Sequence, residues 1–568
     1  MKNNSVYTLG ICNDETSSAC LFVDGRLISA ASEERFSRKK LDDAFPQNAI
    51  NFVLANSSIS FSDLTHIAYS WAKHFDQDLL LKYINRSSLA LQNGTESHHI
   101  FLERIKWDIQ RDTAGRDKYN AWLLNQDLQN IVVQEFYHHE SHAASAALLS
   151  PFNDGIVLTS DGRGDFESTT IWKFDRKEKN CITKVYSAPS CDSLGYFYGR
   201  ITGLLGFKPM RHEGKITGLA ALGDPSKALS LMEKMIDVKN GNLVSNLGPY
   251  YKPFFAPYSE KLLNAVGKFS KEDIAAAAQL HLENCLCKLL MFQLNHLNIT
   301  KTNLMLAGGT FGNVKVTEAL KKLDPINKLF VQPQMGDGGL CLGSAALSVH
   351  SLGFSIKPLK SLFLGPSIND NRLSFTTDSD LFIEKLIDPV EQFCKDLSEE
   401  MVIGLARGRM EFGPRALCNR SIIYKTSDHS INEWLNKRMN RTEFMPFAPV
   451  IRAETAALAF KDFSINDNTL KYMTSTISCS DIFANACPAV THVDQSARPQ
   501  VIQKEDDPFM WNVLKKWEEL SGEMALVNTS FNAHEEPIVC SAEDCIASLK
   551  AGMIDVLYLG NERIMLRK

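Results

Sequence analysis

Two histidines one helical turn apart give the clearest indication of chemistry. His138 and His142 are four residues apart, and the segment 141–149 strongly favours a helix, so both imidazoles would project from one face. Asp161 and Asp337 each lie in a glycine-rich turn, where the backbone can approach a ligand closely. Two imidazoles and two carboxylates suit iron(II) or manganese, with positions left open for substrate. The alternative is an ordinary pair of core or surface histidines.

Two glycine-containing segments could contact an anion or a nucleotide. An apolar stretch at 304–307 ends at Gly308-Gly309 and leads through Asn313 into an expected helix, which would expose backbone N–H groups to an anion. The second segment, 214–224, supplies Lys215 and Asp224. A tight strand-to-helix turn explains the Gly-Gly pair at least as well, and the second segment alone does not decide between a phosphate contact and a loop.

The densest group of cations and amides lies in the last third of the chain. Guanidinium groups match phosphate oxygens in a bidentate manner, and prolines and aromatic residues are interleaved among these arginines. Any single arginine could be a solvated surface charge, but the cluster favours an anion pocket. Its predicted members are Arg415, Arg420, Lys437, Arg441, Arg498, Asn528, Ser530 and Asn532.

A repeated α/β arrangement is expected to position these residues. Apolar stretches at 6–12, 18–23 and 26–31 read as strands, and Asp24-Gly25 is a hairpin signal. A strand, acidic turn, strand pattern recurs at 155–174, which predicts a duplicated α/β fold whose turns converge on one cleft. Glycines, prolines and Asn-Asp-Asn within 352–371 mark a boundary, so we predict domains 1–355 and 356–568, the second also mixed α/β.

The composition describes an ordinary globular protein. The 568 residues include 61 Lys+Arg and 66 Asp+Glu, a net charge of −5, which argues against a nucleic-acid partner. An apolar run of 18 residues and a signal sequence are both missing, so we expect a cytoplasmic protein without membrane spans. Thirteen cysteines without a C-x-x-C pair indicate reduced thiols.

Taken together, these motifs resemble the O-carbamoyltransferases, which include the nodulation and tobramycin carbamoyltransferases. The resemblance covers nearly the whole chain, and the motifs occur in the family's order. They are Glu33-Glu34-Arg35-Phe36, His138-x3-His142, Gly308-Gly309, Glu411-Phe-Gly-Pro-Arg-Ala-Leu417, His492-Val-Asp494 and Asn528-Thr-Ser-Phe-Asn532.

The resemblance implies an N-terminal domain of the actin, sugar-kinase and chaperone-ATPase fold (Kae-like) and a C-terminal YrdC-like domain. It implies that the C-terminal domain forms carbamoyl-adenylate from carbamoyl phosphate and ATP, with Mg2+, and that the N-terminal domain transfers the carbamoyl group to a hydroxyl of a small sugar or natural product. It also implies iron(II) as the metal, held by the two histidines and two aspartates. The acceptor contacts would be Asn13 and Lys40, and the catalytic residues Asp14, Asp224 and Lys215. A homodimer is left open.

Three departures from the family pattern affect these expectations. Asn13-Asp14 stands where the family often has His-Asp, Cys418 replaces a usual glycine, and His534-Glu535 replaces Arg-Gly. Two other functions compete with the main one: a tRNA-modifying carbamoyl or threonylcarbamoyl transferase, and a non-catalytic nucleotide-binding partner. The net charge speaks against tRNA, and the complete metal and arginine sets speak against a non-catalytic role.

Overall fold

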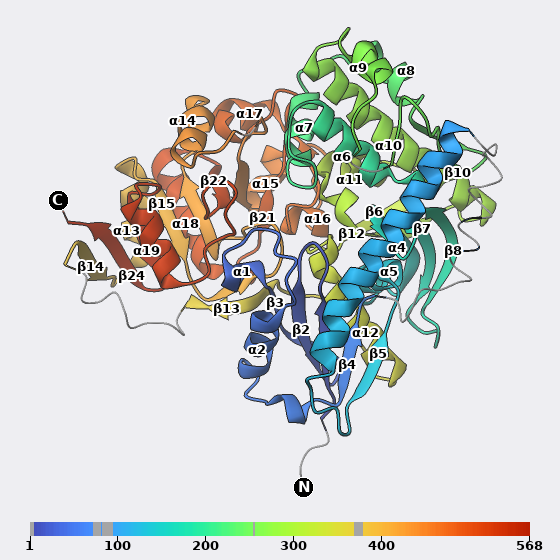
Figure 1. Ribbon diagram of the computed structural model, residues 1–568. Coiled ribbons are helices and arrows are strands. Elements are labelled where there is room, and N and C mark those ends of the chain that lie inside the picture. Colours follow the sequence, from blue (N-terminus) through green and yellow to red (C-terminus); the bar gives the residue numbers. More distant parts are fainter. Residues whose placement is uncertain are drawn as a thin grey trace. The chain divides into compact units, whose positions relative to one another are not determined.

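The computed structural model describes residues 5–71, 81, 84, 95–253, 256–368, 379–442 and 444–567. The chain forms two compact units (Figure 1), one made of residues 1–28 and 43–359 and the other of residues 29–42 and 360–568. The chain crosses between the units three times, and the last crossing, at 359–360, lies within the predicted boundary 352–371, whose last three residues are outside the described part of the chain.

The first unit begins with a five-stranded sheet of order β3-β2-β1-β4-β5. Strands β1 and β2 are antiparallel, whereas β4 and β5 are parallel to β1. Strand β3 begins in this unit and ends in the second. The bounds are β1 Tyr7–Cys12, β2 Ser18–Val23, β3 Arg26–Ser32, β4 His66–Tyr69 and β5 Val132–Glu135.

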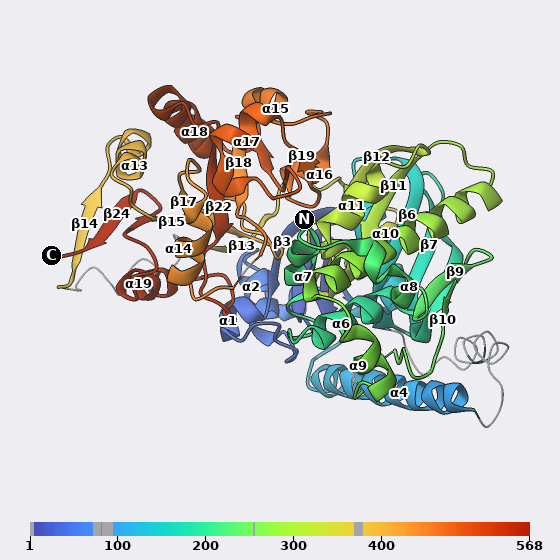
Figure 2. The ribbon, with the colours of Figure 1, turned by 90° about the horizontal axis from the view of Figure 1, so that it is seen from above.

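A second five-stranded sheet repeats this topology. Its strands β6, β7, β11 and β12 are labelled in Figure 2. From β8 its order is β8-β7-β6-β11-β12, in which β6 and β7 are antiparallel while β11 and β12 continue parallel to β6. The prediction of a duplicated α/β fold is therefore confirmed by strand order and direction. The bounds are β6 Asp154–Gly164, β7 Glu167–Asp175, β8 Ile182–Pro189, β11 Thr302–Ala307 and β12 Ile326–Val331.

Two buried helices, α5 (His138–Leu149) and α12 (Leu340–Ser351), pack against each other and against strands of the two sheets. Only glycine fits at Gly343 without movement, because a Cβ there would lie 1.8 Å from the backbone oxygen of Ser141 on α5. The other helices of the unit are α2 Gln47–Ala55, α4 Glu96–Leu123, α6 Leu194–Leu204, α7 Glu213–Ala220, α8 Leu229–Met232, α9 Glu260–Val266, α10 Lys271–His296 and α11 Val314–Lys321, with a hairpin of β9 Ile236–Lys239 and β10 Asn242–Ser245.

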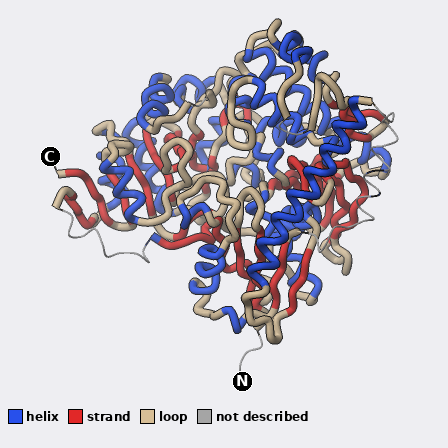
Figure 3. The backbone as a smooth tube through the Cα atoms, in the orientation of Figure 1, coloured by secondary structure: helices blue, strands red, loops and turns tan. Residues whose placement is uncertain are grey.

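The second unit is also mixed α/β, as predicted (Figure 3). Its eight-stranded sheet has the order β14-β24-β23-β15-β17-β22-β18-β21; its likeness to the YrdC fold stays a prediction. The sheet strands are β14 Leu381–Lys385, β15 Ile403–Ala406, β17 Arg420–Tyr424, β18 Ala448–Arg452, β21 Gln500–Ile502, β22 Ala525–Ser530, β23 Val556–Leu559 and β24 Glu562–Leu566. Two short ribbons pair β13 Phe363–Ser367 with β16 Arg409–Glu411 and β19 Ile477–Ser478 with β20 Ser496–Ala497. The helices are α1 Glu34–Ser37, α13 Pro389–Ser398, α14 Ser430–Arg438, α15 Ala453–Ala459, α16 Asn468–Lys471, α17 Asp481–Ala486, α18 Pro508–Ser521 and α19 Ala542–Lys550.

The segment 29–42 belongs to the second unit although it lies near the N-terminus. Arg38 donates hydrogen bonds to the carbonyl oxygens of Pro537 and Ile538, at 2.9 and 2.8 Å, and its Nε lies 3.3 Å from the Asp544 carboxylate. The predicted domain 1–355 included this segment, and no sequence pattern indicated its contacts with residues five hundred positions away.

The close helix contact gives a first prediction. Gly343→Ala should lower the free energy of unfolding by about 1–3 kcal/mol, because the added methyl group forces α12 away from α5. The matched control is Gly115→Ala on α4, where no atom lies within 4 Å of the added Cβ. There the higher helix propensity of alanine should stabilise the protein by up to about 1 kcal/mol. Urea denaturation measures both; equal effects would contradict the packing argument.

Candidate functional site

The four predicted metal ligands converge in the first unit. His138 and His142 lie in the first turns of α5, Asp161 lies on β6, and Asp337 lies in the glycine-rich turn before α12. His142 Nε2 is 3.1 Å from Asp161 Oδ2 and 3.4 Å from Asp337 Oδ1, while His138 Nε2 is 3.7 Å from the same Asp337 oxygen. One ligand atom from each residue lies within 4.8 Å of all the others, which is the spacing that a single cation requires.

The chemistry of these donors fits a divalent metal. Both histidines are fully buried, and none of their four ring nitrogens makes a hydrogen bond with a described residue. Asp337 Oδ1 is buried and lacks a hydrogen bond as well. Polar atoms that are buried without partners are costly, and a cation bound among them would satisfy them together. Two imidazoles and two carboxylates match the preferences of iron(II) and manganese.

Burial sets the protonation of the cluster. It lowers the pKa of His138 well below its usual value, with His142 adding to the effect, so this imidazole stays in the neutral form that binds metals. Burial followed by the charge of Asp161 raises the pKa of Asp337. For Asp161 burial opposes ionisation, but the neighbouring His142 and His138 outweigh it and hold the pKa of this carboxyl below its usual range.

The predicted glycine turn supports this cluster. The N–H of Gly309 donates to Asp161 Oδ2 at 2.9 Å, so the anion that it contacts is a carboxylate of the protein itself. Gly308 has a φ of 105°, and a Cβ there would lie 2.1 Å from the carbonyl oxygen of Ser160. Asn313 caps α11 through bonds from the N–H groups of Lys315 and Val316. A nucleotide contact for this segment stays a prediction, because these bonds account for its geometry.

Asn13 and Asp14, which follow β1, have different roles. Asn13 is buried and engaged at both ends: its Nδ2 donates to the carbonyl oxygen of Gly115, and its Oδ1 accepts from Tyr69. Burial raises the pKa of Asp14, although the cations Arg163 and Arg111 oppose this effect. Asn13 therefore positions the turn, which leaves Asp14 as the candidate for proton transfer.

Sequence reasoning missed an ionic network beside Asp14. Arg163 forms ion pairs with Asp112 and Asp108 of α4, and Arg111 of the same helix lies 3.3 Å from Glu15. Burial, and next the charge of Asp14, raises the pKa of Glu15 to about 8. Burial also raises the pKa of Asp112 to about 6. The only sequence signal was the position of Arg163 next to Asp161 in the glycine-rich stretch 161–165.

Asp224 and Lys215, the other two predicted catalytic residues, lie on other elements of the first unit. The Asp224 carboxylate is exposed and accepts hydrogen bonds from the N–H and hydroxyl of Ser226. Asp224 thereby caps a short 3-10 helix at 225–227. A capping role accounts for the contacts of Asp224, and its catalytic role stays a prediction. Lys215 is buried on α7.

In the second unit, two of the predicted arginines, Arg415 and Arg498, influence each other electrostatically. Burial, and next the positive charge of Arg498, lowers the pKa of Arg415 well below its usual range. Two guanidinium groups that repel each other in this way favour an anion between them. Beside them, the buried Asn528 donates to Gln500 Oε1 at 2.7 Å and to the carbonyl oxygen of Ala416 at 3.2 Å.

Other members of the predicted pocket hold the backbone. The buried guanidinium of Arg420 donates to the carbonyl oxygens of residues 366, 407, 408 and 419, so its role is structural rather than ligand binding. Arg441 donates to the side chains of Thr529, Ser530 and Asn532 and to the carbonyl oxygens of the last two. These bonds tie the strand β22 and its following turn to the Arg441 loop.

The lysines differ from one another. Lys437 is exposed on α14. Lys40, expected to contact the acceptor in the first domain, lies in the second unit, where burial lowers its pKa while the nearby Glu34 and Glu535 oppose this effect. Its assignment to the first domain was wrong because segment 29–42 crosses to the second unit.

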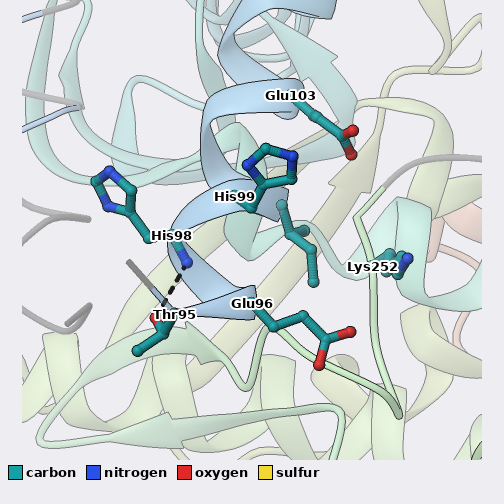
Figure 4. Close-up of a pocket in the computed structure, with 7 residues that line it drawn as sticks. Thr95, Glu96, His98, His99, Glu103 and Lys252 are labelled. Carbon is teal, nitrogen blue, oxygen red and sulfur yellow. Dashed lines mark hydrogen bonds between the residues drawn. The ribbon is translucent and has the colours of Figure 1, made fainter. Parts of the chain in front are cut away.

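One cavity lies away from these residues (Figure 4). It has a volume of about 400 Å³ and adjoins the N-terminus of α4, where the Thr95 hydroxyl accepts from the N–H of His98. Glu96, His99 and Lys252 line it, and none of the predicted site residues does.

The first unit is thus a duplicated α/β unit that brings four candidate metal ligands together, and the second is an α/β unit rich in arginine. A family model for the carbamoyltransferase N-terminus matches residues 8–346, and one for the carbamoyltransferase C-terminus matches residues 394–567. The chain belongs to the carbamoyltransferase family, and it is a carbamoyltransferase enzyme.

The chain is also similar to individual proteins. An uncharacterized protein of Methanocaldococcus jannaschii is 29% identical, with 97% of this chain and 98% of that protein covered. Nodulation protein NolNO of Sinorhizobium fredii is 29% identical over 97% of this chain and 79% of its own, and nodulation protein NolO of Bradyrhizobium diazoefficiens is 30% identical over 74% and 77%. A phosphate- and nucleotide-bound structure of HypF is 15% identical, with a TM-score of 0.33 over 62% of this chain and 56% of that one.

Two further features complete the description. All thirteen cysteines are free thiols. Among the helices that the structure describes, none combines the length and the apolar character needed to cross a membrane.

The donor cluster predicts a metal dependence. His142→Ala should retain its fold but lose bound iron by at least about tenfold after reconstitution with iron(II), because one of four ligands is gone. His139→Gln is the matched control, since His139 is equally buried on α5 but its Nδ1 lies 2.8 Å from the Thr159 hydroxyl, outside the cluster. Metal analysis by mass spectrometry measures both proteins. Full occupancy in His142→Ala would contradict the ligand assignment.

The control residue also predicts a pH dependence. Burial lowers the pKa of His139 to about 3, against about 6.5 in the unfolded chain. Below pH 6.5 the unfolded state therefore binds a proton that the folded state does not, which costs about 1.4 kcal/mol of stability per pH unit. His139→Gln removes this cost, so its stability relative to the wild type should rise as the pH falls from 6.5 to 4.5. Equilibrium unfolding at several pH values measures this; a constant difference would contradict the assignment.

Proposed function

We propose that the protein is an ATP-dependent O-carbamoyltransferase with two half-reactions. In the second unit, water hydrolyses carbamoyl phosphate to carbamate and phosphate, and an oxygen of the carbamate then attacks the α-phosphorus of ATP, with pyrophosphate leaving. In the first unit, the carbamoyl group of the resulting carbamoyl-adenylate passes to a hydroxyl of a small sugar or natural product, and AMP leaves. Family membership supports carbamoyl transfer; the paired Arg415 and Arg498 support the use of phosphates.

The adenylation step depends on positive charge. Arg415 and Arg498 would bind phosphate oxygens and stabilise the negative charge that develops on them as the bonds rearrange. Arg441 would hold the turn that carries Ser530 and Asn532 against the same substrates, since it already bonds both residues. Mg2+ would accompany ATP as its usual counter-ion.

The transfer step depends on the buried cluster of the first unit. A metal held by His138, His142, Asp161 and Asp337 would act as a Lewis acid that polarises the carbamoyl or phosphate oxygen. Asp14 would accept the proton of the acceptor hydroxyl, since burial raises its pKa and makes its carboxylate a stronger base. The carboxylates and arginines around it would orient a polar acceptor.

The observation that carries this proposal is the presence of two different sites in one carbamoyltransferase: a metal-ligand cluster in the first unit and an arginine pair in the second. The test is incubation with carbamoyl phosphate, ATP, Mg2+ and iron(II). Pyrophosphate release that depends on carbamoyl phosphate, together with a gain of one carbamoyl unit on a hydroxylated metabolite in mass spectrometry, is expected. A gain of one carbamoyl unit on tRNA, and on none of the metabolites, would favour the tRNA-modifying alternative.

The arginine pair predicts where the first half-reaction takes place. Arg415→Ala and Arg498→Ala should each reduce carbamoyl-phosphate-dependent pyrophosphate exchange by roughly tenfold to a hundredfold, because each loses a charged contact worth about 1.5–3 kcal/mol. Arg438→Ala is the matched control, since its guanidinium binds Asp555 on the exposed side of α14. Unchanged exchange in both pocket variants would rule out this assignment.

The two sites also predict that the half-reactions separate. Asp337→Asn should still form carbamoyl-adenylate but fail to carbamoylate an acceptor, because it alters only the metal cluster of the first unit. Pyrophosphate and acceptor mass are measured in the same reaction. Loss of both activities in a variant with an unchanged thermal melt would mean that one composite site performs both steps.

A further inference from the structure

The loop that carries Arg415 is held by side chains rather than by secondary structure. Residues 412–419 connect β16 with β17 and form neither a helix nor a strand. Cys418 adopts a φ of 73°, a left-handed conformation that costs a residue with a Cβ, which explains the family's usual glycine at this position. Such a loop keeps one conformation only if contacts around it specify that conformation.

Glu411 supplies the strongest of these contacts. Its side chain is buried at the end of β16, and one carboxylate oxygen, Oε1, accepts three backbone N–H bonds. The donors are Leu417 at 2.6 Å, Asn419 at 2.9 Å and Arg420 at 3.2 Å. Hydrogen bonds to a charged acceptor are about twice as strong as neutral ones, so this carboxylate fixes the returning half of the loop.

Arg35 holds the outgoing half of the same loop. This buried arginine lies in the segment 29–42, which belongs to the second unit, and its Nη2 donates to the carbonyl oxygen of Gly413 at 3.0 Å. Its Nη1 lies 3.2 Å from the Glu34 carboxylate, which fixes the guanidinium. A residue near the N-terminus thus braces the loop two positions before Arg415.

The loop 412–419 needs to be held in place because it carries Arg415, which is repelled by Arg498. Arg415 and Arg498 are half-buried like charges that repel each other, and this repulsion favours moving the loop away. An anion would offset that repulsion, but before it binds, other contacts must hold the pair together. Glu411 and Arg35 are the residues whose bonds oppose this movement.

We propose that Glu411 and Arg35 are positioning residues that hold the loop carrying Arg415, so that its guanidinium group receives a phosphate group. The inference rests on the proposed function, in which that group belongs to carbamoyl phosphate. It also means that the first half-reaction depends on a residue from the N-terminal part of the chain.

A double-mutant cycle in the full-length protein tests this proposal. Glu411→Gln keeps the size of the side chain but removes its charge, and it should raise the KM for carbamoyl phosphate in pyrophosphate exchange by about tenfold while kcat changes less than about threefold. In an Arg415→Ala background the same substitution should change KM less than about twofold, because the residue through which it acts is gone. Independent, multiplicative effects, or an unchanged KM, would overturn the proposal.

Two further variants separate positioning from stability. Arg35→Ala should also raise the KM for carbamoyl phosphate, and Arg35→Lys should restore it in part. If Glu411→Gln does not fold, Arg35→Ala replaces it in the double-mutant cycle with Arg415→Ala. Tyr558→Phe is the control: it removes one hydrogen bond to a buried carboxylate of the same unit, that of Asp396, and should lower the melting temperature without changing KM. A KM increase in Tyr558→Phe equal to that in Glu411→Gln would overturn a positioning role.

Binding of inorganic phosphate separates this proposal from the proposed function. Calorimetry should give an affinity that is lost in Arg415→Ala and weakened about tenfold in Glu411→Gln. If the wild type shows no carbamoyl-phosphate-dependent exchange but phosphate affinity follows this order, the proposed function is wrong and the positioning role is supported. Equal phosphate affinity in the wild type and Glu411→Gln would overturn the positioning role.

Discussion

Buried donor atoms without partners are the constraint on which the first unit depends. His138, His142 and Asp337 place ring nitrogens and a carboxylate oxygen in an interior where none makes a hydrogen bond with a described residue. Such atoms are tolerated only if something else satisfies them. One divalent cation could bind all of these atoms, because the ligand atoms of the four residues lie within 4.8 Å of one another. The cluster is therefore a candidate metal centre.

The duplicated fold explains how distant residues reach this centre. The equivalent sheets bring the turn after β1 and the end of β6 to it, while the packing of α5 on α12 adds the histidines and the Asp337 turn. Gly343 permits that packing, and the N–H of Gly309 holds Asp161. In the second unit the functional side chains are positively charged, and Glu411 and Arg35 hold the loop that carries one of them, Arg415.

Some of this arrangement could be predicted from the sequence, and the reason is spacing. The i, i+4 histidines and the aspartates between glycines carry local signals, as does the strand, turn, strand repeat. Residue type alone does not settle the roles of Arg420, Asp224 and Asn313, because the same types also bind carbonyls and cap helices, as these three do. The transfer of segment 29–42 to the second unit depends on contacts about 500 residues away, which no local pattern encodes.

The most direct test of the account is a crystal of the iron(II)-loaded protein examined by anomalous diffraction at the iron absorption edge. The account predicts one strong peak coordinated by Nε2 of both His138 and His142 and by the carboxylates of Asp161 and Asp337, with distances near 2.0–2.2 Å. A peak bound by other residues, or an empty cluster in a crystal grown with saturating iron, would contradict it.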